Sequence, residues 1–235
     1  MGMSARAAVL VHGFSGTPAS MAPLAAALRE RGWHVETPVL AGHGTRWQDL
    51  RDTSWRDWYA SVDHAVESAK QATTAGQVAL VGLSVGGALS LRAGAVRSDI
   101  SRIVLVNPSL GVQNPFLPLV PMLKGILRSI PNGQSQVKDP SVEYTSYPRL
   151  PLNAIQQLSQ LWRDVGGYLP SVTAPLLVFR SLADGEQGRT SALKALEGVS
   201  SASTKEILLH RSGHVATLDY DSALIAAETA TFLKS

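Results

Sequence analysis

The sequence predicts an α/β fold in which helices cover both faces of a mostly parallel sheet. Short apolar runs typical of buried strands alternate with longer stretches of helical spacing, and the first four runs are Ala7–Val11 and residues 33–40, 77–81 and 103–106. This alternation indicates βαβ units, because parallel neighbours need a crossover helix. With 235 residues, 45% hydrophobic and 17% charged, the chain is long and apolar enough for one well-buried core.

The helices between these strands have recognisable starts. Thr17 and Pro18 suit the N-cap and first position of a helix that Gly32 ends. Ser54 and Asp57 fit a capping box at the start of the next helix. The apolar side chains of that helix recur at helical spacing and predict a core-facing side made of Trp55, Trp58, Val62 and Val66. A further apolar helix is expected over Val85–Val96.

The α/β rhythm breaks after residue 107 and returns at about residue 172. The intervening segment is rich in proline, shows helical spacing at residues 119–130 and 152–169, and contains no convincing strand. Beyond it we expect strands at 175–181 and Thr204–Leu209, and helices at 190–197 and 219–233. A structureless loop of this length is uncommon inside a compact domain. We therefore expect residues 1–107 and 172–235 to form the core and residues 108–171 to form a helical cap.

Composition excludes several classes of function. Lys and Arg number 21 against 18 for Asp and Glu, without any basic run, so nucleic-acid binding is not expected. The absence of cysteine excludes disulfides, thiolate catalysis and cysteine-ligated metals. No apolar window is long enough for a membrane span, and the start of the chain lacks a signal-peptide pattern. We expect a cytoplasmic protein; the sequence does not predict its oligomeric state.

Residues 82–86, with the sequence GLSVG, match the G-x-S-x-G nucleophile elbow. The motif lies between a predicted strand and a predicted helix, which is the context it requires. A serine on such a strained turn projects from the sheet, and glycines on either side leave room for the close approach of the two elements. The start of the following helix also favours a developing negative charge. These features identify Ser84 as a candidate nucleophile.

A serine hydroxyl needs a base to remove its proton. In a Ser…acid…His order the base follows Ser84, which leaves His210 and His214. His214 is favoured because it lies in the loop between the last strand and the last helix. Sites collect in loops at the carboxyl ends of strands in sheets of this kind. His210 is interpreted as a partly exposed residue at the end of a strand.

The third member should be a carboxylate that holds the other imidazole nitrogen. Asp184 follows the strand predicted at 175–181 and so lies at the carboxyl end of a strand. Glu186 is two residues away and is kept as the alternative. Two backbone donors are needed for an oxyanion hole, and the N–H groups of Val85 and Phe14 are the candidates. His12 is interpreted as a brace for the loop that contains Phe14.

Several motifs together resemble the small bacterial carboxylesterase and monoacylglycerol lipase group of the α/β-hydrolase superfamily. The matching stretches span most of the chain and read HGFSGTPASMAPLAAAL, AGHGT, WRDWY, VGLSVGGALSL, APLLVF and SGHVATLD. The resemblance implies an α/β-hydrolase fold with Ser84 as nucleophile, His214 as base, Asp184 as orienting acid and Phe14 and Val85 as oxyanion donors. It also implies that no metal or cofactor is used.

The chain departs from this group in two places. The acid loop usually reads S-x-x-D-x-V-V-P, whereas residues 181–188 read SLADGEQG, which predicts a more flexible loop. The first core strand begins close to residue 1, so the leading antiparallel hairpin of the superfamily is expected to be absent.

The cap is expected to supply an apolar pocket for the acyl chain. Its candidate lining residues, which can equally hold the cap to the core, are Phe116, Leu119, Met122, Leu123, Leu127, Leu158 and Trp162. The apolar residues 117–127, with Lys124 and Arg128 at their edge, also suggest transient contact with a lipid surface.

The predicted function is hydrolysis of carboxylic esters with short- to medium-chain acyl groups, monoacylglycerols among them, through an acyl-enzyme on Ser84. The substrate is then a small ester or a lipid. Two alternatives stay open: the same three residues acting on a thioester, a C–C bond or an acyl acceptor, and a non-enzymatic relative that binds a ligand. A haloalkane dehalogenase is disfavoured because the elbow residue is Ser rather than Asp.

Overall fold

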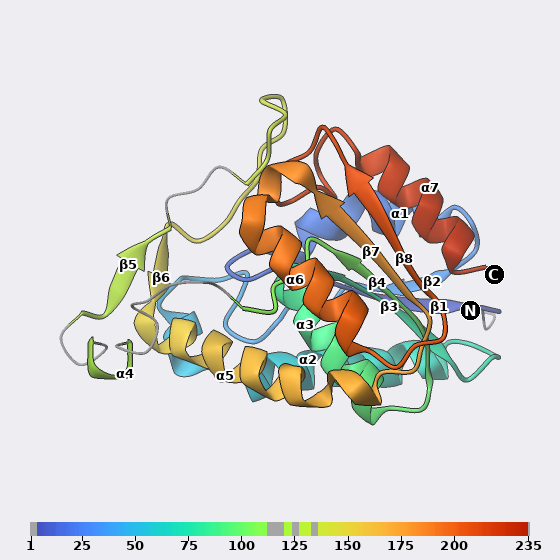
Figure 1. Cartoon of the computed structure of the whole chain (residues 1–235), viewed down its shortest axis with the longest axis horizontal. Helices are drawn as coiled ribbons and strands as arrows, with labels where there is room; N and C mark the ends of the chain where they lie inside the picture. The colour runs from blue at the N-terminus through green and yellow to red at the C-terminus, as the bar shows by residue number, and fades with distance from the viewer. Residues whose placement is uncertain (1–3, 112–119, 124–126, 133–135, 235) are drawn as a thin grey trace.

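The computed structural model describes residues 4–111, 120–123, 127–132 and 136–234, shown in Figure 1. Its centre is a six-stranded sheet with the order β2-β1-β3-β4-β7-β8, in which every pairing is parallel. The strands are β1 (Ala7–Val11), β2 (His34–Glu36), β3 (Val78–Leu83), β4 (Ile100–Val106), β7 (Leu176–Ser181) and β8 (Thr204–Leu209). The predicted α/β fold with a parallel sheet is confirmed.

Helices cover both faces of this sheet. One face packs against α1 (Ala22–Arg29) and α7 (Ser222–Phe232), and the other against α2 (Trp55–Gln71), α3 (Val85–Val96) and α6 (Gly185–Gly198). In β1, Val9 and Val11 belong to one core and Ala8 and Leu10 to the other. A strand buried on both faces carries apolar residues at every position, which explains its continuous apolar run.

Of the two helix starts predicted from capping residues, the one at Ser54 is confirmed and the one at Thr17 is not. At α2 the Ser54 side chain accepts from the Asp57 backbone and the Asp57 side chain accepts from the Ser54 backbone, so the capping box is present. Near residue 17 the helix starts later than expected. Thr17 makes no side-chain capping bond, and Pro18 opens the 3₁₀ turn η1 (Pro18–Met21) before α1 begins. A second 3₁₀ turn, η2 (Asp49–Asp52), precedes α2.

The segment after β4 differs most from the sequence-based expectation. A helix at 119–130 and no strand were predicted. The described residues of this range form the short helix α4 (Val120–Leu123) and most of a strand, β5 (Ser129–Pro131). β5 pairs antiparallel with β6 (Arg149–Pro151), so part of the predicted helix is strand. Pairing with a partner twenty residues away outweighs local helical spacing, and Pro131 disfavours a continuing helix.

The remaining elements follow the prediction more closely. α5 (Leu152–Tyr168) ends in the 3₁₀ turn η4 (Leu169–Ser171) and contacts α2 and α3. The strand expected at 33–40 is shortened to β2, and α6 begins five residues earlier than predicted. α7 begins later, at Ser222. Within the described ranges, no helix is both long enough and apolar enough to cross a membrane.

The core side of α2 yields a test of the packing. Trp58 is fully buried and its Nε1 donates to Thr53 Oγ1 at 2.9 Å. We expect Trp58→Ala to lower the free energy of unfolding by about 3–5 kcal/mol, because it leaves a large cavity. Urea unfolding measures the change. The control is His64→Ala, on the exposed side of the same helix, which should change stability by less than about 0.5 kcal/mol; equal losses would contradict the packing.

Candidate active site

Ser84 occupies a strained turn between β3 and α3. Its backbone angles are φ 55° and ψ −117°, in a region that L-residues rarely adopt. The turn is possible because its neighbours lack side chains. A Cβ atom on Gly82 would overlap the Gly86 backbone, and a Cβ atom on Gly86 would overlap the Val11 carbonyl oxygen. The predicted nucleophile elbow is therefore present, with the hydroxyl at the carboxyl end of the sheet.

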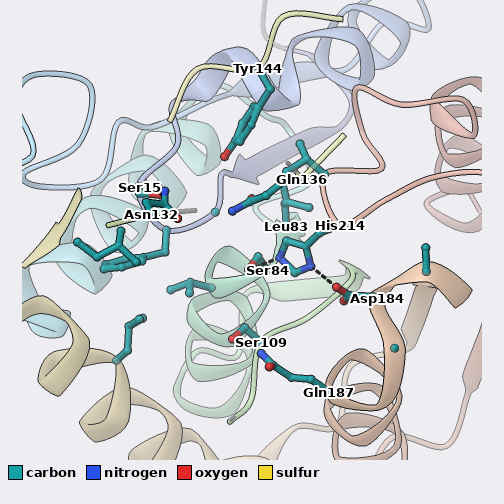
Figure 2. Close-up of a pocket in the computed structure, with 18 of the residues that line it drawn as sticks. Ser15, Leu83, Ser84, Ser109, Asn132, Gln136, Tyr144, Asp184, Gln187 and His214 are labelled. Atoms are coloured by element: carbon teal, nitrogen blue, oxygen red, sulfur yellow. Dashed lines mark hydrogen bonds and ion pairs between the residues drawn. The ribbon is translucent and has the colours of Figure 1, made fainter. Parts of the chain in front are cut away.

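The structure brings Ser84, His214 and Asp184 into one hydrogen-bonded relay, shown in Figure 2. His214 Nε2 lies 2.9 Å from Ser84 Oγ, and His214 Nδ1 lies 2.8 Å from Asp184 Oδ1. Because a carboxylate only accepts, Nδ1–H donates to Asp184 and Nε2 is left to accept the proton of the serine. This is the arrangement that activates a serine hydroxyl.

The two alternatives named from the sequence lie elsewhere. Glu186 is exposed and its carboxylate lies 3.3 Å from Arg189 of the same helix. His210 is exposed at the end of β8. The two carboxylates differ in direction: that of Asp184 faces the imidazole, and that of Glu186 lies on an exposed side chain beside Arg189. Sequence spacing alone does not encode that difference.

Asp184 is held by a compact turn rather than by a long flexible loop. It is the last residue of the 3₁₀ turn η5 (Leu182–Asp184), and α6 starts at the next residue. Gly185 has a positive φ of 65°, which lets the chain reverse into the helix. Gly188 lies directly against Asp184, since a Cβ atom there would be 2.6 Å from Oδ2. Gly188 thus leaves room for the Asp184 carboxylate.

The loop after β1 lies beside the nucleophile. A Cβ atom on Gly13 would be 3.2 Å from Ser84 Cβ, and both Phe14 and Val85 line the same cavity as Ser84. His12 braces this loop from below: its Nδ1 lies 2.9 Å from the Gly13 carbonyl oxygen, and its Nε2 accepts from the Leu40 N–H at 3.2 Å. Burial lowers the pKa of His12 to about 4. A neutral ring suits both bonds.

His43 is a buried residue that the sequence analysis left without a role. Its ring packs edge-on against Phe14 and Trp58 and stacks on Tyr147 at 6.3 Å between centroids. Burial, with His12 as a second cause, lowers the pKa of His43 to about 3, so it is neutral. It supports the side chain of Phe14, the residue expected to offer an oxyanion donor. The motif AGHGT was visible in the sequence, but the contacts of its histidine were not.

A cavity of about 430 Å³ opens above the relay. Leu158 and Trp162, both predicted for the pocket, line it. Met122 and Leu127 are 75% and 46% exposed and are absent from its described lining. Phe116 and Leu119, and the side chain of Leu123, lie outside the described residues. The lining also contains polar residues that the sequence analysis missed because no periodicity marks them: Ser15, Ser109, Asn132, Gln136, Tyr144 and Gln187.

No metal site accompanies these groups in the part of the chain that the structure describes, where no three His, Asp or Glu side chains gather closely enough to hold an ion.

The Asp219 side chain links the loop that carries His214 to the segment before β6 through hydrogen bonds. Asp219 is 2% exposed, and its carboxylate accepts from four backbone N–H groups at 2.7–3.0 Å, those of Gly213, Lys138, Asp139 and Tyr220. Burial opposes ionisation, but the four N–H bonds outweigh it and hold the pKa of Asp219 below its usual value. The ionised carboxylate therefore stabilises the loop that carries the imidazole.

Asp219→Asn tests this contribution. The amide replaces one acceptor oxygen, so at neutral pH we expect the free energy of unfolding to fall by about 2–4 kcal/mol. The pKa of Asp219 is lower in the folded protein than in the unfolded chain, where it is about 4. The stabilisation by the ionised carboxylate is therefore complete above the pKa of the unfolded chain, and it is lost as the pH falls below about 4. Urea unfolding across this range should show the difference between the two proteins shrinking with acid. A difference independent of pH would contradict the role.

Comparison with known proteins is consistent with this geometry. The chain is 35% identical to a thermostable monoacylglycerol lipase of Bacillus sp. (strain H-257), over 95% of this chain and 88% of that protein. It is 28% identical to a carboxylesterase of Bacillus subtilis (strain 168), over 97% of this chain and 92% of that protein.

Solved structures agree in fold. A structure reported for LipS and LipT, two metagenome-derived lipolytic enzymes, superposes with a TM-score of 0.91 at 30% identity, over 99% of this chain and 95% of that chain. A monoacylglycerol lipase of Paleococcus ferrophilus superposes with a TM-score of 0.81 at 18% identity, over 99% and 96% of the two chains. The family model described as "Alpha/beta hydrolase family" matches residues 8–228. The chain belongs to the alpha/beta hydrolase family.

Proposed function

We propose that this carboxylic ester hydrolase acts through an acyl-enzyme formed on Ser84. The observation that carries the proposal is the continuous relay from Ser84 Oγ through His214 to Asp184, open to the cavity. A serine on a strained turn, with its hydroxyl hydrogen-bonded to an imidazole nitrogen, is poised for attack on a carbonyl carbon. The named relatives, a monoacylglycerol lipase and a carboxylesterase, support an ester as the bond that is cleaved.

The reaction proceeds in two acyl transfers. His214 Nε2 takes the proton from Ser84 as Oγ bonds to the ester carbonyl carbon, and the carbonyl oxygen becomes an oxyanion. The N–H groups of Phe14 and Val85 stabilise this oxyanion. The protonated imidazole then passes its proton to the leaving alcohol as the C–O bond breaks. Water repeats the attack on the acyl-enzyme, releasing the carboxylic acid and restoring Ser84, while Asp184 stays ionised and keeps Nδ1 protonated.

The substrate is proposed to be an ester with a short- to medium-chain acyl group, monoacylglycerols included. A cavity of about 430 Å³ is of the size that holds small molecules, and Leu150, Leu158 and Trp162 give it apolar walls for an acyl chain. We propose further that residues 108–171 act as a cap on a core formed by residues 1–107 and 172–235. α5, within that cap, supplies Leu158 and Trp162.

Two further features of the proposal concern the surroundings of the enzyme. Met122 and Leu127 are exposed apolar residues, and the charged Arg128 directly follows Leu127 in the chain, which favours transient contact with a lipid surface. Most of residues 117–127, on which that interpretation was based, lies outside the described residues. A cytoplasmic location is also proposed, in keeping with a chain that contains no cysteine.

Removing the nucleophile tests the proposal. Ser84→Ala should fold, since alanine is smaller, and should lose nearly all hydrolysis of p-nitrophenyl butyrate, a loss of at least about 10³-fold in kcat. Intact mass after treatment with a fluorophosphonate should show one adduct on the wild-type protein and none on the variant. Full turnover by Ser84→Ala would rule out the mechanism. A panel containing thioesters tests whether the same relay prefers another bond.

The assignment of the acid is tested by a matched pair of variants. Asp184→Asn keeps the shape of the side chain but removes the charge that fixes Nδ1–H, so kcat should fall by about 10²–10⁴-fold. Glu186→Gln makes the same chemical change two residues away, on an exposed side chain, and should leave kcat within about twofold. Initial rates with p-nitrophenyl butyrate distinguish the two. The reverse pattern would assign the role to Glu186.

A further inference from the structure

Asn107 lies at the carboxyl end of β4, directly between the strands that lead to Ser84 and to Asp184. It is fully buried and has a positive φ of 44°, a conformation that Asn tolerates better than most residues. Its backbone N–H donates to the Phe179 carbonyl oxygen of β7 at 2.9 Å. Placed there, its side chain faces the loops that follow β7 and β8, although no side-chain atom of Asn107 lines the cavity.

The carboxamide of Asn107 joins these two loops. Its Oδ1 accepts from the Ser181 N–H at 2.7 Å. Its Nδ2, which carries two hydrogens, lies within hydrogen-bond distance of three oxygens: His214 O at 2.7 Å, Ser181 Oγ at 2.9 Å and Gly213 O at 3.2 Å. Ser181 Oγ in turn donates to the Gly213 carbonyl at 2.8 Å. Ser181 ends β7, three residues before Asp184. One buried side chain therefore holds the backbone of the base and the entry to the acid loop.

The peptide unit that follows His214 is fixed at both of its polar atoms. The His214 carbonyl accepts from Asn107 on the sheet side, and the Val215 N–H donates to the Gln136 carbonyl oxygen at 2.8 Å on the opposite side. Rotation of this peptide would swing the imidazole away from Ser84 and Asp184. Holding this peptide in place requires a hydrogen-bond donor on the sheet side of the His214 carbonyl, and the Asn107 amide is that donor.

We propose that Asn107 is a positioning residue that sets the imidazole of His214 against the Asp184 carboxylate, a role that rests on the function proposed above. Asn107 does not touch the cavity, so it acts on the alignment of the relay and leaves ester binding unchanged. Misalignment of about 1 Å is enough to cost about 10²-fold in rate. The effect of losing its amide should therefore appear in kcat rather than in KM.

Two substitutions separate the amide from the backbone conformation. Asn107→Gly removes the carboxamide but keeps a residue that readily adopts a positive φ. Asn107→Asp keeps the shape, but its second carboxylate oxygen faces the carbonyl oxygens of Gly213 and His214 in place of Nδ2. The matched control is Ser181→Ala, which removes a buried hydroxyl from the same network and leaves the Asn107–His214 contact in place.

Two measurements are made on the wild-type protein and the three variants. Rates with p-nitrophenyl butyrate are expressed per site titrated with a fluorophosphonate, so that an unfolded fraction does not count. Proton NMR records the deshielded signal of His214 Nδ1–H in its bond to Asp184. We expect kcat to fall by about 10- to 100-fold in both Asn107 variants with KM within about twofold, and the signal to weaken or disappear. Ser181→Ala should stay within about threefold and keep the signal.

Several results would overturn the inference. These are an unchanged kcat in Asn107→Gly, an intact Nδ1–H signal in both Asn107 variants, a rise in KM as the main effect, or an equal loss in Ser181→Ala. A wild-type protein that hydrolyses no ester and takes up no fluorophosphonate would instead contradict the proposed function. The NMR signal still tests the placement of the imidazole in that case, because it reports the His214–Asp184 bond without any turnover.

Discussion

Gly86 lies against the carbonyl oxygen of Val11 at a separation that admits no Cβ atom, and the geometry of the active site depends on this contact. It lets the first turn of α3 approach the end of β1. The chain must then turn at Ser84 with a positive φ, which directs the hydroxyl out of the sheet. The same approach brings Gly13 beside the Ser84 side chain. Ser84 and the loop expected to stabilise the oxyanion are thus fixed by one packing constraint.

The candidate base and acid, His214 and Asp184, are placed by a second kind of interaction, buried polar bonds to backbone. Asn107 holds the carbonyl side of the His214 loop, and Asp219 accepts four backbone N–H groups around it. Asp221 accepts from Ser212 and Arg211 in the same loop. Buried polar groups are costly unless they are paired, so a fully paired network of this kind favours a single arrangement of the loop.

The segment before β6 connects the two halves of the site. Asn132 donates to Ser15 in the loop after β1, and Gln136 accepts from Val215 beside the base. Lys138 and Asp139 donate to Asp219. Asn132 and Gln136, which line the cavity, are therefore bonded to the loop after β1 and to the loop that carries the imidazole. Substitutions in this segment are expected to affect alignment as well as substrate fit.

The sequence by itself determined the elements whose signals are local. The glycine spacing around Ser84, the helix Val85–Val96 and the capping box at Ser54 follow from steric and hydrogen-bonding rules that act within a few residues. The parallel sheet follows from the alternation of apolar runs. Candidate roles for Ser84, Asp184 and His214 could be named because each stands in a recognisable motif or at the end of a predicted strand.

The tertiary structure decided whatever depends on partners distant in the chain. It made residues 129–131 a strand through pairing with β6, and it turned Asp184 rather than Glu186 toward the imidazole. It also gave Asn107 its role, which no local pattern announces, because its partners lie 74 and 107 residues away. The direction of a side chain and its hydrogen bonds to distant residues are set only when the strands are brought together. The order of residues along the chain therefore does not predict them.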